Sequence, residues 1–230
     1  MNLLAVDTSG ACCSAAVMKD GVFAAEISAQ LGRSHARHVM DLVSLVLQAS
    51  GSETADIDAY GVTEGPGSFT GLRIGMATVK GLAFARGRPA AGVSTLYALA
   101  RPLRWFAGLV CPVLDARKTE VYAEIYRFSG QGHSVESPAA AWSPESLAEQ
   151  VRRLGEPCLF AGTGAELYRG VISSALGELA SFASPELSRI SARSVAEAAA
   201  EKIADGCHKS AAELVPVYLR KSDAERKRSA

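Results

Sequence analysis

The chain repeats one order of predicted elements, and this repetition restricts its fold more than any other feature. LLAVD at 3–7 predicts a short strand that ends in Asp7, and LVCPVLD at 109–115 predicts another that ends in Asp115. In each half, two more strands, a helix, a strand, a glycine-containing turn and a helix follow. We therefore predict two copies of one α/β unit, each a lobe of mixed sheet flanked by helices.

The boundary between the two lobes is expected near residues 101–108, where the first set of elements has ended. We place the first lobe over residues 1–100 and the second over residues 101–221. An alanine-rich helix predicted at about 191–205 therefore falls in the second lobe. Residues 222–230 form a short charged tail that we expect to be frayed and disordered.

Composition excludes several classes of protein. The 230 residues are 48% hydrophobic and 21% charged, as in ordinary globular proteins. The 24 Lys and Arg balance 24 Asp and Glu, so any RNA contact must be local or shared with a partner. The five cysteines form no CxxC pair, and no apolar run has membrane length. We expect no signal peptide, because the first apolar run is short and lacks a basic start. We expect a soluble, cytoplasmic protein with reduced thiols and no membrane contact.

GPGSFTGLRIG, at 65–75, looks like a phosphate-binding loop but matches neither common type. A Walker A loop needs lysine where Leu72 stands, and the glycine spacing is GxGxxxG rather than the GxGxxG of dinucleotide sites. The loop precedes a helix predicted from about Thr70 to Arg86, whose first N–H groups could bind an anion. The alternative is a tight structural turn in which glycine allows close backbone approach, and general physics favours this second interpretation.

Asp7 and Asp115 occupy equivalent strand ends, so we expect them to face each other across a cleft suited to Mg²⁺ and phosphate. The alternative is that each acid caps its own turn. TSG follows the first acid but ARK follows the second, so the second lobe is poorly equipped and we expect no strong nucleotide hydrolysis. The residues expected at a weak nucleotide site are Asp7, Thr8, Ser9, Asp115, Gly162 and Gly164.

Two histidines, His35 and His38, stand three residues apart at the start of a predicted helix, and Asp41 follows after three more. Such a set could bind iron or zinc. Steps of three residues drift around a helix, however, and the chain has no HExxH. We predict local pairing or solvation of these side chains and no metal site.

Two helices of the first lobe carry more apolar surface than one core needs. The apolar residues of 39–47 cover about 220° of the helix circumference, against little more than 100° for a helix packed on one core. The Thr70–Arg86 helix has two apolar faces separated by a charged stripe. Both helices could be buried within the chain, but we favour a protein interface. Its expected residues are His35, His38, Met40, Leu47, Ile74, Ala77, Gly81, Phe84 and Ala85, with Arg73 and Lys80 as the stripe.

LLAVDTS, a three-strand meander and GPGSFTGLRIG with its helix resemble the bacterial TsaB (YeaZ) family and its catalytic relative TsaD, over residues 3–220. The resemblance implies a duplicated actin-like ATPase fold with ribonuclease-H-like lobes. It also implies a non-catalytic subunit that binds TsaD. The complex forms N6-threonylcarbamoyladenosine next to the anticodon of tRNAs that read A-starting codons. TsaE is the accessory ATPase of this system, and TsaB proteins form homodimers when alone.

The departures from TsaD agree with such a role. TsaD-like proteins bind metal through HxxxH, whereas this chain has HxxH in SHARH, and AGTG at 161–164 is a partial remnant of their nucleotide motif. We expect that the chain has no cofactor of its own and that the metal belongs to the partner. Weak binding of ADP or ATP by this chain stays open. Two enzymatic alternatives stay open: a nucleotide-dependent transferase or kinase using Asp7 and Asp115, and a metal-dependent peptidase using His35 and His38.

Overall fold

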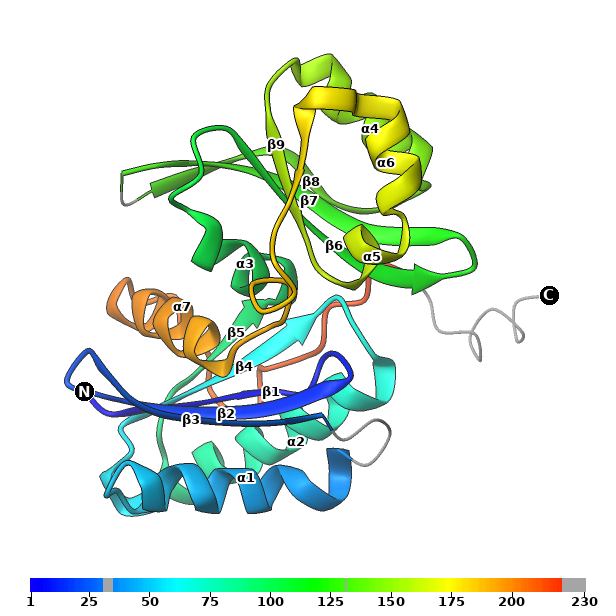
Figure 1. Ribbon diagram of the computed structural model, residues 1–230. Coiled ribbons are helices and arrows are strands. Elements are labelled where there is room, and N and C mark those ends of the chain that lie inside the picture. The colour runs from blue at the N-terminus through cyan, green and yellow to red at the C-terminus, as the bar shows by residue number, and fades with distance from the viewer. Residues whose placement is uncertain (31–34, 131, 221–230) are drawn as a thin grey trace. The chain divides into compact units, whose positions relative to one another are not determined.

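The computed structural model describes residues 1–30, 35–130 and 132–220, with the side chains of 35–37 outside the description. The chain forms two compact units (Figure 1). The first unit comprises Met1–Ala98 and Ile190–Val217, and the second comprises Leu99–Arg189 with the chain from Tyr218 on. The first break in the chain therefore lies close to the predicted boundary.

The first unit contains a five-stranded mixed sheet in the order β3-β2-β1-β4-β5. Strands β1, β2 and β3 are antiparallel neighbours, whereas β1, β4 and β5 run parallel. The turn between β2 and β3 has left-handed φ angles of 50° at Asp20 and 79° at Gly21, which suit a tight hairpin. The strands are β1 (Leu3–Asp7), β2 (Cys12–Lys19), β3 (Val22–Gln30), β4 (Ala59–Gly65) and β5 (Ala90–Ser94).

The second unit repeats this sheet in the order β10-β9-β6-β7-β8. Strands β6, β7 and β8 are again antiparallel neighbours, and β6, β9 and β10 run parallel. The repeated order and directions confirm the predicted duplication, although the three-residue β10 was not predicted. The strands are β6 (Leu109–Arg117), β7 (Glu120–Ser129), β8 (Gly132–Trp142), β9 (Cys158–Ala161) and β10 (Ala180–Phe182).

Helices cover both faces of the first sheet. Helices α1 (His35–Ala49) and α2 (Phe69–Arg86) lie below it in Figure 1, and α7 (Ala192–Ala204) lies above it. The alternation along β1 serves both layers, because Leu4 packs with α1 and α2 while Leu3 packs with α7. Local signals set the bounds of α2: it begins at the N-cap Ser68 and ends at the left-handed Gly87.

The position of α7 corrects the predicted division of the chain. We expected residues 101–221 to form the second lobe, but Ile190–Val217 pack on the first sheet. The buried side chains of Val195 and Ala199 lie against it, and a Cβ at Gly61 would stand only 2.7 Å from Ala199 Cβ. This small-residue contact lets the helix approach the sheet closely, which the element order alone does not reveal.

The second unit has its helices packed mainly on one face of its sheet. Helices α4 and α6 lie side by side there, and Leu147, Val151, Ile172 and Leu176 enter the core between them and the strands. None of the helices in the described ranges combines the length and apolar character needed to cross a membrane. The remaining elements are α3 (Thr95–Ala100), α4 (Pro144–Leu154), α5 (Thr163–Leu167), α6 (Arg169–Leu176), and the 3₁₀ turns η1 (Thr54–Asp56), η2 (Arg101–Leu103) and η3 (Gly177–Leu179).

Candidate functional site

The glycine loop packs directly against the turn between β1 and β2. A Cβ at Gly71 would stand 2.0 Å from the carbonyl oxygen of Thr8, and one at Gly67 would stand 2.6 Å from that of Ser9. Both neighbours are backbone atoms, which cannot move aside cheaply. Close backbone packing therefore explains why glycine occupies these two positions, and no ligand is needed for that explanation.

Hydrogen bonds also join the glycine loop to the turn between β1 and β2. The Thr8 hydroxyl donates to the Gly71 carbonyl at 2.7 Å, and the Ser68 N–H donates to the Ser9 carbonyl at 2.8 Å. The Ser68 hydroxyl in turn accepts from the Gly71 N–H at 3.2 Å, which satisfies one free donor at the start of α2. The geometry supports the interpretation of the loop as a tight turn that sets the direction of α2.

Asp7 is buried and serves as the hydrogen-bond acceptor of this turn. Its Oδ1 accepts from the Ser9 N–H at 3.0 Å, the Ser9 hydroxyl at 2.6 Å and the Thr63 hydroxyl at 2.8 Å. Burial, together with the negative charge of Asp7, raises the pKa of the neighbouring Cys13 thiol to about 12. The arrangement agrees with the capping alternative for Asp7.

Asp115 has a different environment in the second unit. It is exposed, its Oδ1 accepts from the Arg117 N–H at 2.8 Å, and its own N–H donates to the Thr163 hydroxyl at 3.2 Å. The predicted Gly162 and Gly164 flank that threonine, so this part of the proposed nucleotide set does gather in one place. Whether Asp7 and Asp115 face each other, and whether either group binds a nucleotide, stay predictions.

The surface of α1 is less apolar than predicted. Leu47, which we expected at the interface, is buried in the core of the first unit. The buried residues of this helix occupy more than one row along its surface. The exposed apolar side chains are Met40, 50% exposed, and Leu45, 49% exposed. His38 Nδ1 lies 3.5 Å from Asp41 Oδ2, in agreement with local pairing. The side chain of His35 lies outside the described residues.

Helix α2 presents one buried and one exposed apolar face, as predicted. Its core face consists of Leu72, Met76, Val79 and Ala83. Ala77, Gly81 and Ala85 are exposed on the other side, where Phe84 is 83% exposed, while Ile74 is only partly buried against the core. The Phe84 ring therefore contributes little to the core of its own unit.

The predicted charged stripe is used within the chain. The Arg73 guanidinium stacks on the Phe69 ring, 3.9 Å from its centroid. The Lys80 ammonium donates to the carbonyl oxygens of Ala212 at 3.2 Å and Leu214 at 3.0 Å, so Lys80 binds the segment that follows α7. Sequence reasoning missed this contact, although the apolar AAELVPVY at 211–218 signals a segment with a packing role.

That segment, residues 209–217, is called the C-terminal strap below. Its backbone pairs with Ala90 through Lys209, and the Val217 N–H donates to the Glu64 carbonyl at 2.7 Å. The strap therefore lies beside both α2 and the glycine loop. Within the described ranges, no three His, Cys, Asp or Glu side chains gather where they could hold a metal ion.

Two ribonuclease-H-like sheets of identical strand order define a duplicated protein of the actin-like ATPase class. A ROK hexokinase from Thermus thermophilus shares this fold alone, with a TM-score of 0.51 and 14% identity over 90% of this chain and 100% of its own.

Closer similarities identify the family. The family model described as TsaD, tRNA N6-adenosine threonylcarbamoyltransferase, matches residues 24–228. The TsaB tRNA threonylcarbamoyladenosine biosynthesis protein of Bacillus subtilis is 30% identical over 227 residues, covering 99% of this chain and 97% of the relative. YeaZ from Pseudomonas aeruginosa has a TM-score of 0.79 at 30% identity, over 95% of this chain and 99% of its own. The chain belongs to the TsaB (YeaZ) family, which confirms the resemblance found in the sequence.

Proposed function

We propose that this chain is a non-catalytic subunit of the machinery that forms threonylcarbamoyladenosine on tRNA. In this proposal it binds a TsaD-type transferase through one exposed face of α1 and α2. The names of the relatives support the pathway, and the exposure of Phe84 is the observation that carries the binding mode. The face, called the docking face below, consists of Met40, Leu45, Ala77, Gly81, Phe84 and Ala85.

The docking face has the shape that helix packing requires. Nothing lies within 4 Å of the Cβ position of Gly81, and its neighbour Ala77 is small, so a partner helix can approach closely. Phe84, one turn further, supplies a large apolar side chain for a pocket on the partner. A transferase of the same fold has the corresponding helix pair to offer, and a second copy of this chain would occupy the face when no transferase is present.

The glycine loop supports a non-catalytic role. The donors and acceptors that join it to the β1–β2 turn bind the chain's own groups, and Asp7 caps that turn. We propose that the chain needs no cofactor of its own and that the metal belongs to the transferase. TsaE would join the larger complex, tRNA would be its substrate, and the assembly would work in the cytoplasm.

The test compares two glycine-to-arginine variants. Gly81 lies on the docking face and Gly170 lies on α6 of the second unit, and both have open space where a side chain would begin. Titration calorimetry with a purified TsaD-type transferase should show at least about 30-fold weaker binding for Gly81→Arg. Gly170→Arg should bind like the unmodified chain. Equal affinity for both variants would place the interface elsewhere.

A further inference from the structure

The connection between α3 and β6 presents an aromatic side chain that the core of the second unit does not use. Its sequence from 101 to 108 is RPLRWFAG. Trp105 is 66% exposed, whereas Leu103, two residues earlier, is fully buried. Because tryptophan is enriched at binding interfaces, this exposed indole is a candidate contact for a ligand.

Backbone hydrogen bonds and one ring contact order the turn that carries this indole. The Arg104 N–H donates to the Arg101 carbonyl at 3.3 Å, and the Phe106 N–H donates to the Leu103 carbonyl at 3.0 Å. The Phe106 and Trp105 rings form a T-shaped pair, with centroids 6.2 Å apart. The backbone of the turn is thus ordered and the indole packs against one neighbouring ring, which lowers the entropy cost of stacking.

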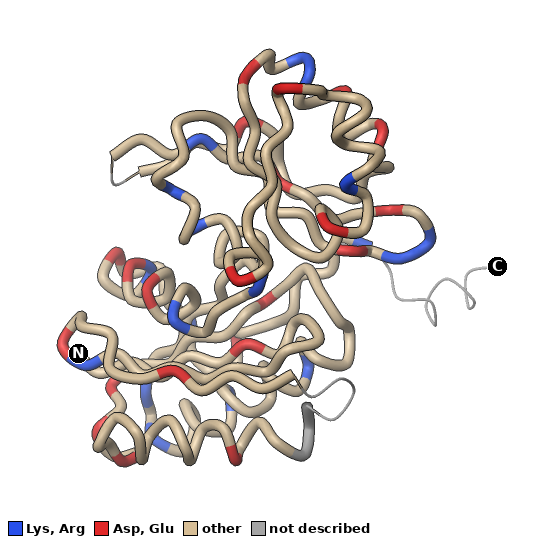
Figure 2. The backbone as a smooth tube through the Cα atoms, viewed as in Figure 1, with Lys and Arg blue, Asp and Glu red and all other residues tan. Residues whose placement is uncertain are grey.

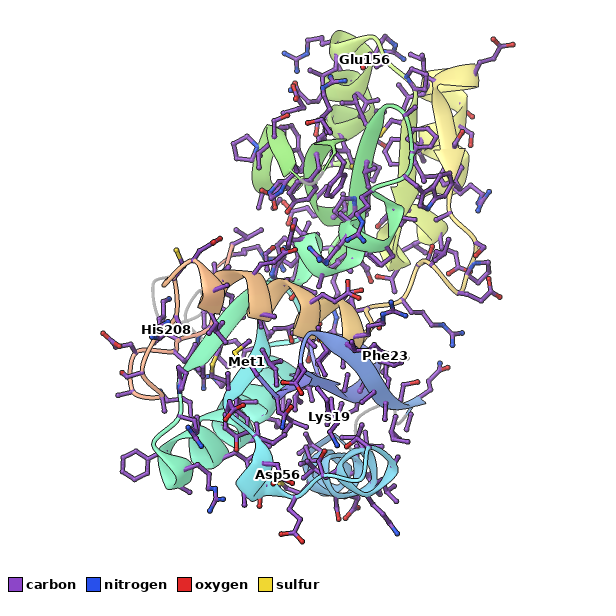
Figure 3. All side chains as sticks on the ribbon, turned by 90° about the vertical axis from the view of Figure 1, so that its left-hand side faces the viewer. Met1, Lys19, Phe23, Asp56, Glu156 and His208 are labelled. Atoms are coloured by element: carbon purple, nitrogen blue, oxygen red, sulfur yellow. The ribbon has the colours of Figure 1, made fainter. Side chains whose placement is uncertain are left out.

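The local charge is positive. Residues 95–108 contain two arginines and no acid, and in Figure 2 the tube between α3 and β6 carries blue but no red. Within the described part of the chain, the Arg104 guanidinium forms no ion pair. The acid Glu156, labelled in Figure 3, binds Arg127 through Oε1 at 2.7 Å from Nη2. The Glu156 carboxylate is therefore paired with Arg127 and not with Arg104.

We propose that Trp105 and Arg104 form a contact for an unpaired stretch of RNA, with the indole stacked on a base and the guanidinium on a phosphate. Unpaired bases are recognised in this way by aromatic side chains, with arginine binding the backbone. The inference rests on the proposed function, which makes tRNA the substrate of the complex. A small, local contact of this kind is compatible with the zero net charge of the chain.

The experiment uses the full chain alone, so that it does not depend on the transferase. The chain has two tryptophans, and Trp142→Phe leaves Trp105 as the only indole. An anticodon stem-loop RNA is titrated while indole fluorescence and the anisotropy of labelled RNA are recorded. We expect saturable quenching, because a stacked base quenches the indole it covers. Trp105→Ala should weaken RNA binding about tenfold, and Arg104→Ala should reduce the slope of log affinity against log salt by about 0.7.

Three outcomes would overturn the inference. One is the absence of quenching up to roughly 1 mM RNA, beyond the range of non-specific binding. Another is equal RNA affinity for Trp105→Ala and the unmodified chain. A third is loss of transferase binding in Trp105→Ala with RNA affinity unchanged, which would make the turn a protein contact. Gly81→Arg should bind RNA normally, so failure of the docking face and failure of the RNA contact are distinguishable.

Discussion

Replacing Phe84 with alanine should weaken the complex with the transferase without harming the fold. The side chain is 83% exposed in the isolated chain. A phenylalanine buries roughly 150 Å², so binding would remove about 120 Å² from water. At about 25 cal/mol per Å² this contributes about 3 kcal/mol. Ordering the side chain costs about 1 kcal/mol, which leaves about 2 kcal/mol, or about a 30-fold change in Kd.

Titration calorimetry measures the dissociation constant, and urea denaturation measures the free energy of unfolding of the same variant. The unfolding free energy of Phe84→Ala should stay within about 0.5 kcal/mol of the unmodified chain, because the lost ring is outside the core. Phe84→Leu should retain part of the affinity. A dissociation constant within twofold of normal for Phe84→Ala would refute the reasoning from exposed area.

Three further predictions concern the first unit and its strap. Gly71→Ala should lower the unfolding free energy by about 1–3 kcal/mol because its Cβ meets a backbone carbonyl, whereas Gly10→Ala, with open space around it, should be neutral in the same urea titration. Lys80→Met should cost about 1–3 kcal/mol and expose the strap to limited proteolysis, since two carbonyl groups lose their donor; an unchanged digestion pattern would contradict this role. Burial raises the pKa of Cys13, so its thiolate fraction falls at any given pH. At pH 8 iodoacetamide should modify exposed Cys207 in the native chain and Cys13 only after unfolding, as mass spectrometry would show.

Local signals in the sequence predicted most of the elements. The strand pattern located β1 to β3 and β6 to β8, and the helix predicted from about Thr70 to Arg86 matches α2 closely. The three-residue β10 carries too little pattern to be recognised. The sheet on which α7 packs is decided by a tertiary contact between small residues at Gly61 and Ala199, which no local pattern contains.

The candidate site was predicted in outline and not in detail. Periodicity showed two apolar faces on α2, and the structure confirms which one is buried. On α1, the wide apolar arc of 39–47 contained both buried Leu47 and exposed Leu45, so periodicity did not show which side of the helix faces the core. Lys80 looked like part of a solvent-facing stripe because its partners are backbone carbonyls from a distant segment.

Reconstitution of tRNA modification tests the central claim most directly. A TsaD-type transferase and its accessory proteins are combined with the unmodified chain, with Gly81→Arg, or with no added chain, and threonylcarbamoyladenosine is measured by mass spectrometry. The proposal predicts full modification with the unmodified chain, strongly reduced modification with Gly81→Arg, and none without it. Full modification in the absence of this chain would contradict the proposed role.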